Sequence, residues 1–277
     1  MRGLLPRAGL AFAVLALVVW SLAPAAWQVL TALKPDRDVV RVPTVYLPRP
    51  VTWQHVAALW ERKPIGVYLA NSAGISGAST LLSILLAAPA ASALRRATKR
   101  SRRRVLHGLL ALTVFPPILL LYPLYQGVRI LGWLNHPLAL ILPYAALSLP
   151  LSIWILERGF SSIPSAVEEA AALDGLGPAR RVLFIQLPLA APSLVTAAIL
   201  AFIFSWNEFM LALTFMTRDA RKTVTAGIAS VSGSSMFEIP WGQLSAAIVI
   251  ATLPLVLLVL LFERRIASGL TRGAIKG

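Results

Sequence analysis

Three neighbouring residues within a long apolar stretch are the first candidates for chemistry: Trp206, Asn207 and Glu208. A carboxylate in such a stretch is costly to desolvate, so it is a functional candidate by default. The amide and carboxylate could bond sugar hydroxyls, and the indole could stack on a sugar ring. Glu208 could instead relay a proton or tie helices together through a buried hydrogen bond. The residues alone leave these roles open.

Several kinds of catalytic and metal site are excluded. The chain has no cysteine, which excludes thiol nucleophiles and cysteine-ligated metals. Its three histidines, His55, His107 and His136, have no metal-ligand spacing. No G-x-x-x-x-G-K-[ST] loop is present to bind nucleotide phosphates. Asp174 is not followed by the clustered aspartates that a metal-dependent membrane phosphotransferase would need. We therefore expect no metal, no cofactor and no enzymatic activity.

The composition indicates a membrane protein. Residues of the types AVILMFWYC make up 57% of the 277 residues, and charged residues only 13%. A soluble domain has roughly 25% charged residues, so this chain could not cover a globule of its size with polar surface. Lipid must cover part of it.

Six apolar stretches are long enough to cross a hydrocarbon core about 30 Å thick, which needs roughly 20 helical residues. They are residues 8–33, 65–94, 105–128, 137–156, 189–217 and 242–262. Because the stretches are continuous and do not alternate with polar residues, they predict helices and not a barrel. We expect an all-α, polytopic membrane protein with six transmembrane helices, forming a single transmembrane domain over residues 1–277.

Two features modify this picture. The first stretch has a competing interpretation as a signal peptide, with Ala23-Pro24-Ala25 as its cleavage site, but it is longer than such a segment needs. Prolines within the later stretches predict kinks, because each removes a helix hydrogen bond. These prolines are Pro116, Pro117, Pro143, Pro150 and Pro254.

The basic residues predict that both termini are cytoplasmic. With that orientation the cytoplasmic segments carry 16 Lys and Arg residues and the outer loops carry 10. The cluster from Arg95 to Arg104 contributes most to the difference. A nucleic-acid site is the alternative interpretation of this cluster, and we favour a topology signal that touches anionic membrane lipid.

The loop of residues 158–188 predicts two short helices. Ser165 and Glu168 have the spacing of a capping box, in which each side chain bonds the other residue's backbone N–H. A helix over 166–174 would end at Gly175, in a left-handed conformation. Pro178 suits the first turn of a second helix. Such a helix–Gly–helix segment is more ordered than a plain connector.

This loop resembles the cytoplasmic signature of permease subunits from bacterial ATP-binding-cassette importers. The signature is E-A-A, two residues, D-G-A, eight residues, I-x-L-P, and the one departure is Leu176 in place of alanine. The matching positions are Glu169, Ala170, Ala171, Asp174, Gly175, Ile185, Leu187 and Pro188.

Two further segments, residues 205–209 and 269–277, are similar to the maltose-permease-like branch of this family. Residues 233–238 are similar to trehalose-type relatives.

The resemblance implies a type I importer permease in the bacterial plasma membrane. Its partners would be a second permease, two ATP-binding-cassette ATPase subunits and an extracytoplasmic sugar-binding protein. The matched loop residues would couple the permease to the ATPases, and the substrate would be a di- or oligosaccharide such as trehalose or maltose. Another possibility is an ion-coupled secondary transporter that uses Glu208 as a relay, although such a carrier does not require the ordered loop.

Overall fold

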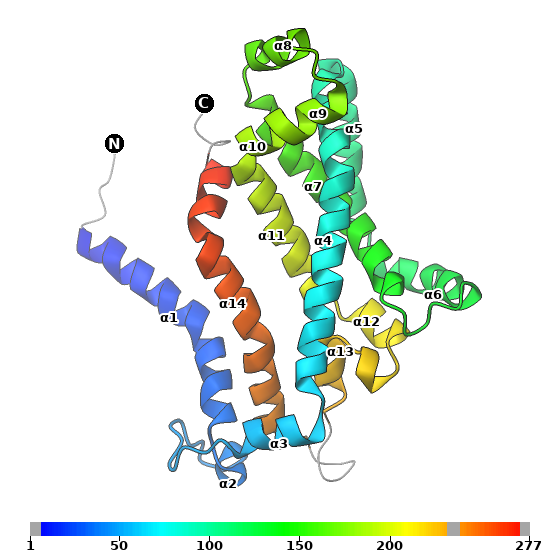
Figure 1. The fold of residues 1–277 in the computed structure, drawn as a ribbon. Coiled ribbons are helices and arrows are strands. Elements are labelled where there is room, and N and C mark those ends of the chain that lie inside the picture. Colours follow the sequence, from blue (N-terminus) through cyan, green and yellow to red (C-terminus); the bar gives the residue numbers. More distant parts are fainter. Residues whose placement is uncertain (1–6, 232–238, 272–277) are drawn as a thin grey trace. The chain divides into compact units, whose positions relative to one another are not determined.

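The computed structural model describes residues 7–231 and 239–271, with side chains described for 9–231 and 239–262. Regular structure in these residues is helical, without a β-strand, so the predicted all-α class is confirmed (Figure 1). The longer helices are α1 Arg7–Ala32, α3 Gln54–Arg62, α4 Ile65–Arg96, α5 Lys99–Thr113, α6 Leu121–Ile130, α7 Leu138–Ser161, α8 Ser165–Leu173, α11 Ala191–Asn207 and α14 Trp241–Thr271.

Short helical segments connect these elements. They are α2 Asp36–Val39, α9 Pro178–Arg181, α10 Leu187–Leu189, α12 Met210–Phe215 and α13 Val224–Ala229, two 3-10 turns at Pro117–Leu120 and Asp219–Arg221, and a π-helical turn at Val182–Gln186.

The chain forms two compact units. Unit one comprises residues 1–65 and 227–254, and unit two comprises residues 66–226 and 255–277. Both predicted site segments, the loop 158–188 and residues 206–208, belong to unit two.

Unit one has an apolar α1 and a close helix contact. The side chains of Phe12 and Trp20 on α1 are largely exposed, so lipid must cover them if α1 crosses the bilayer. At the end of α1, the Lys34 carbonyl oxygen lies 2.9 Å from His55 Nε2 of α3. A side chain at Gly242 would overlap the His55 ring. Glycine is therefore what allows the start of α14 to approach α3.

Unit two has two clusters of buried apolar residues along α7. One joins the start of α7 to α4, α12 and α13 through residues such as Tyr144, Ile75 and Phe215. The other joins the end of α7 to α4 and α11 through residues such as Phe160 and Ala197. Helices α7 and α11 are in close contact, because a Cβ on Gly159 would lie 2.5 Å from Ser193 Oγ. Helix α7 is thus packed along its whole length.

Four helices among the described residues are long and apolar enough to cross a membrane. They comprise residues 9–32, 65–96, 138–161 and 241–262, which correspond to the first, second, fourth and sixth predicted stretches. Two pairs of helices, each bent at a short break, are also long and apolar enough when the two members are taken together. The described residues therefore offer up to six crossings if each bent pair is counted as one.

The bends occur where the backbone cannot continue a straight helix. The third stretch is divided at Pro116 and Pro117, and its two parts are bent by 83°. Proline lacks the N–H of the helix ladder, so the kink predicted here is confirmed as a complete break. Helices α7 and α14, by contrast, continue through Pro143, Pro150 and Pro254. The second bend, of 90°, separates the segment 178–189 from α11.

The fifth predicted stretch is also divided. Helix α11 ends at Asn207, Glu208 has an extended backbone, and α12 begins at Met210. The apolar composition of residues 189–217 predicts one long helix, and the break lies at its charged residue.

Candidate functional site

The helix α8 has a firm C-terminal stop. Gly175 has a φ of 78°, so the predicted left-handed conformation is confirmed. The Leu176 N–H donates to the Ala171 carbonyl at 3.0 Å, and the Gly175 N–H donates to the Ala172 carbonyl at 3.1 Å. These two bonds form a Schellman motif, which satisfies carbonyls that the helix end would leave unpaired. The direction in which the chain leaves α8 is therefore fixed by hydrogen bonds.

The predicted capping box at the other end of α8 is wrong. Pro164, and not Ser165, is the N-cap residue, and no side chain caps the helix there. The Glu168 carboxylate turns instead to Arg95, at the end of α4, and to Gln186 in the π-helical turn. A bond between a carboxylate and a guanidinium is stronger than one to a neutral backbone N–H. The Glu168 carboxylate therefore pairs with Arg95 and does not cap α8.

Arg95 binds both α8 and the residue two positions before it. One guanidinium nitrogen pairs with Glu168, and the other donates to the Ile163 carbonyl oxygen at 2.6 Å. Gln186 is 2% exposed and donates to the same Glu168 oxygen. We call Arg95, Glu168 and Gln186 the anchor. The anchor connects α8 to the end of α4 and to the segment that precedes α11; α8, α9 and α10 lie beside that end of α4 in Figure 1.

Sequence reasoning missed the anchor. Arg95 appeared to be only part of a topology signal, and Gln186 is the variable position of the I-x-L-P motif. The available signal was a lone amide within the apolar run from Val182 to Leu189, since a buried amide needs partners.

A second ion pair stabilises the same end of unit two. The Glu157 carboxylate on α7 is 1% exposed, and it accepts from Arg102 Nε of α5 at 2.9 Å. Ser161 Oγ donates to the same carboxylate at 2.7 Å. Because a buried charge must be paired, Arg102 fixes the start of α5 to α7.

Much of the remaining surface of α8 is exposed. Among the predicted coupling residues, Glu169, Ala170 and Asp174 are exposed, whereas Ala171 is buried against unit two. Leu173, which sequence reasoning did not single out, is 89% exposed. A large apolar side chain between two acids, on a helix held from behind by an ion pair, is typical of a docking surface. We call Glu169, Leu173 and Asp174 the α8 face.

The last three predicted loop residues lie beyond α9. Ile185 and Leu187 are partly buried, and Pro188 is exposed. They flank Gln186 and lead into the 90° bend before α11. The motif therefore extends from α8 to the start of the next long helix.

The second predicted set lies at the break between α11 and α12. Trp206 is 3% exposed and stacks on Phe202, with ring centroids 5.6 Å apart. Asn207 is exposed, and its amide donates to the Ile203 carbonyl at 2.9 Å. Of the three residues, Asn207 is exposed, Glu208 is partly buried and Trp206 is buried.

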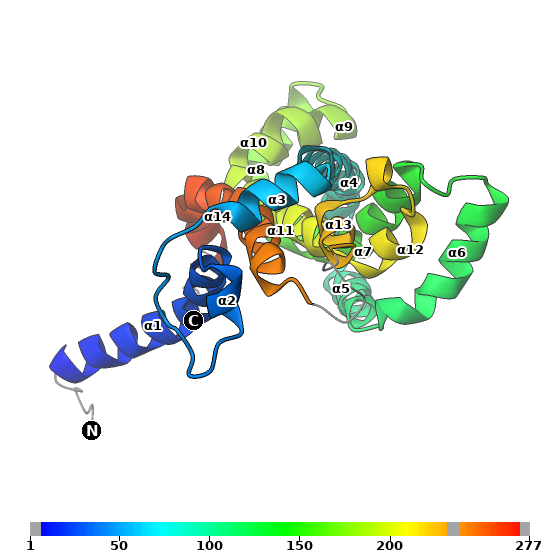
Figure 2. The ribbon, with the colours of Figure 1, turned by 90° about the horizontal axis from the view of Figure 1, so that it is seen from below.

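The Glu208 carboxylate makes three hydrogen bonds within unit two. It accepts from the Tyr144 hydroxyl of α7 at 2.6 Å, and from the backbone N–H groups of Leu211 and Ala212 at 2.9 and 3.2 Å. The Glu208 carbonyl accepts from Thr225 Oγ1 at 2.9 Å (Figure 2 shows α12 and α13 near each other). Glu208 thus caps α12 and ties α7 to α13, which favours the structural role over an ion relay.

The two predicted sets do not come together. Tyr144, which bonds Glu208, and Glu157, which directly precedes the loop 158–188, are separated by 13 residues of α7, about 20 Å at 1.5 Å per residue. The geometry contains two separate sites on a common helix.

Known proteins similar to this chain belong to the kind of family that the loop motif indicates. Residues 79–272 match the model of a family described as "Binding-protein-dependent transport system inner membrane component". Two other segments that carried the resemblance, residues 233–238 and 269–277, lie outside the residues whose side chains the structure describes.

Two relatives match most of the chain. The sulfoquinovosyl glycerol transport system permease protein SmoH of Agrobacterium fabrum is 38% identical, over 94% of this chain and 91% of its own. The trehalose/maltose transport system permease protein MalG of Thermococcus litoralis is 44% identical, over 76% of this chain and 75% of its own.

A solved structure shares the fold. It is a chain of a bacterial importer of the acidic polysaccharide alginate, with a TM-score of 0.76 and 18% identity, covering 95% of this chain and 99% of that one. The predicted importer-permease fold is confirmed by this likeness.

The contacts of Glu208 generate a prediction about stability. Tyr144→Phe removes the hydroxyl donor, and Glu208→Gln replaces one carboxylate oxygen with an NH2 group that cannot accept. Each change should lower the unfolding free energy by about 1–3 kcal/mol, and the two losses should not be fully additive, because both act on the bond between Tyr144 and Glu208. The measurement is the thermal unfolding midpoint of the purified transporter in detergent.

Tyr122→Phe is the matched control, because the Tyr122 hydroxyl accepts from Gln126 on an exposed surface of α6. It should leave the midpoint unchanged. If Glu208→Gln kept full stability and abolished transport, the carboxylate would act on the substrate or on a proton, and the structural role would be wrong.

Proposed function

The chain belongs to the family of binding-protein-dependent transport system inner membrane components, and from this we propose that it is the permease subunit of an ATP-driven sugar importer. It is a multi-pass protein of the plasma membrane, and it has the transporter role of its relatives. No observation favours the ion-coupled carrier considered from the sequence.

We propose a di- or oligosaccharide as the substrate. One relative is named for trehalose and maltose and the other for sulfoquinovosyl glycerol, so both names denote glycosides. Trehalose, maltose or a related glucoside remains our first expectation, on the strength of the 44% identity to the trehalose/maltose permease.

The proposed assembly contains four other subunits. A second permease would complete the translocation path, and an extracytoplasmic sugar-binding protein would deliver the substrate. Two ATPase subunits would hydrolyse ATP, because this chain has no phosphate-binding loop of its own. Within the assembly, residues 1–277 would act as one transmembrane permease domain.

We propose that α8 is the coupling helix, and the observation that supports this role is the exposed α8 face. Its exposed leucine and two acids suit a cleft with an apolar floor and basic rim, as a partner ATPase would offer. A flexible loop would absorb motion in its own dihedral angles. Here the Schellman motif fixes one end of α8 and the anchor fixes the other, so movement of a docked partner would pass to α4 and towards α11.

We also propose that the break after α11 borders the sugar path. The exposed amide of Asn207 suits hydrogen bonding to sugar hydroxyls. Glu208 would hold that break in shape through its bonds to Tyr144 and α12. Trp206, packed on Phe202, would support Asn207 from behind.

Both termini are proposed to be cytoplasmic. Through the ion pairs Arg95–Glu168 and Arg102–Glu157, the basic cluster and the loop 158–188 lie at the same end of unit two. The positive-inside tendency therefore assigns α8 to the side on which ATP is available.

The coupling proposal predicts that changes on the α8 face abolish transport while the protein still inserts into the membrane. Asp174→Arg reverses a charge on the α8 face, and Leu173→Ala removes its apolar side chain, which contributes on the order of 1–2 kcal/mol when buried. Both variants should insert normally but lower sugar uptake at least about tenfold. They should also lose the stimulation of ATP hydrolysis by sugar-loaded binding protein.

Glu61→Arg makes the same charge reversal on an exposed position of α3 and should leave uptake unchanged. Full uptake by Asp174→Arg, with the ATPases still bound, would refute the assignment of α8. Failure of every variant to reach the membrane would refute the claim that the α8 face serves docking and not folding.

The orientation predicts a labelling pattern. The chain has no cysteine, so a single cysteine can be placed at exposed Ser101 or Thr44 without altering others. A membrane-impermeant maleimide should label Ser101→Cys only from the cytoplasmic side and Thr44→Cys only from outside. The reverse pattern would invert the proposed topology.

A further inference from the structure

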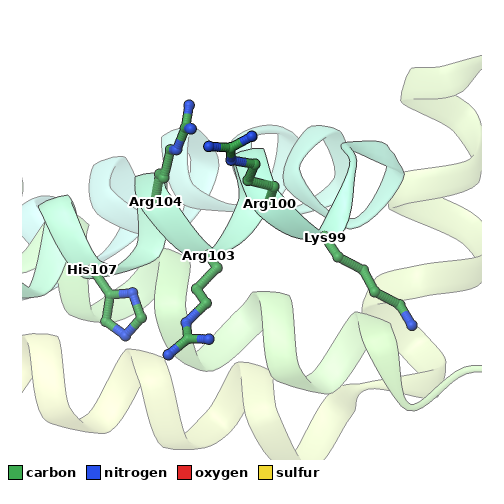
Figure 3. Close-up of a pocket in the computed structure, with 5 residues that line it drawn as sticks. All are labelled: Lys99, Arg100, Arg103, Arg104 and His107. Carbon is green, nitrogen blue, oxygen red and sulfur yellow. The ribbon is translucent and has the colours of Figure 1, made fainter.

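A cavity on α5 is lined entirely by basic side chains. Its volume is about 400 Å³, and the lining residues are Lys99, Arg100, Arg103, Arg104 and His107 (Figure 3). Four of these side chains carry a permanent positive charge at neutral pH. Such a cavity attracts a multivalent anion.

The lining residues form two rows. Arg100 and Arg104 extend from one edge of α5 in Figure 3, and Lys99, Arg103 and His107 extend from the opposite edge. Residues four apart lie on one face of a helix, and like charges at this spacing repel each other. The helix also begins here, capped by Thr98, so its dipole adds positive potential. An anion between the rows would relieve the repulsion.

Arg102 differs from its neighbours. It turns to α7 and pairs with the buried Glu157, so it serves the fold. Within the described part of the chain, no carboxylate lies within ion-pair distance of the five lining residues. Their charge is thus available to a ligand.

The surface beyond the cavity is apolar. The same face of α5 continues beyond His107 through Ala111 to the C-cap residue Val114. Both are exposed, Val114 by 81%, and none of the residues of α5 is buried. A ligand that spans this surface needs an anionic end beside the arginines and a hydrocarbon portion along the helix. A phospholipid has this structure.

We propose that the basic cavity on α5 binds the headgroup of an anionic phospholipid, with the phosphate between the two rows and the acyl chains along Ala111 and Val114. Guanidinium groups bind phosphate through paired N–H donors, which suits the three arginines. The proposal concerns the lipid surface of the permease and does not depend on which sugar is carried.

The test uses the assembled transporter in nanodiscs that contain equal amounts of phosphatidylglycerol and phosphatidylcholine. The bound lipids are counted by native mass spectrometry after release. Each basic residue near an anionic surface contributes about fivefold to binding at low salt. The triple variant Arg100→Gln/Arg103→Gln/Arg104→Gln should therefore retain phosphatidylglycerol at least about tenfold less than the parent protein, while retention of phosphatidylcholine stays constant.

The matched control, Arg37→Gln/Arg49→Gln/Arg62→Gln, removes three exposed arginines outside α5 and should retain phosphatidylglycerol like the parent. Equal retention by the parent protein and the α5 variant would overturn the proposal. Displacement of the lipid by inorganic phosphate or glycerophosphoglycerol at the same concentration would also overturn it, in favour of a soluble anion. Loss of a partner subunit from the α5 variant, with phosphatidylglycerol still bound, would assign the cavity to a protein contact instead.

Discussion

The ion pair between Glu168 and Arg95 is the interaction on which the arrangement of this end of the permease depends. The Glu168 carboxylate is largely buried, and its charge is balanced by Arg95 while Gln186 supplies a further donor. Removing one partner of such a pair leaves an uncompensated charge, which costs about 3–5 kcal/mol. The same guanidinium holds the Ile163 carbonyl just before α8. One cluster of polar groups therefore sets both the entry into α8 and its distance from α4.

Helix α4 extends this constraint across unit two. At its far end, the Asn71 amide donates to the Ala220 and Lys222 carbonyls at 3.1 and 3.0 Å, and Ser72 Oγ accepts from the Val224 N–H at 2.8 Å. Asn71 and Arg95 are separated by 24 residues of one helix, about 36 Å. Helix α4 continues through Pro89 and is bonded at both ends, so displacement of α8 would move the loops before α13. The proposed coupling needs such a rigid connection.

Local sequence signals predicted the features that local geometry decides. Gly175 adopts its left-handed conformation and Pro178 opens α9, because each depends on the residue's own backbone preference. The role of Glu168 was predicted wrongly, since its partner Arg95 is 73 residues away and a local pattern cannot weigh such a competitor. The break at Glu208 was missed for the same reason: apolar composition predicts one helix, whereas Tyr144 and the α12 amides supply the bonds that make a break favourable.

The most direct test of the anchor replaces its ion pair with a removable covalent link. The double variant Arg95→Cys/Glu168→Cys, in an otherwise cysteine-free transporter, can be joined by a short bis-methanethiosulfonate linker and released by a reductant. We predict that the unlinked variant binds the ATPases but loses sugar uptake, and that linking restores uptake until the link is reduced. Uptake at the parent level by the unlinked variant would contradict the claim that α8 moves the membrane helices through this contact.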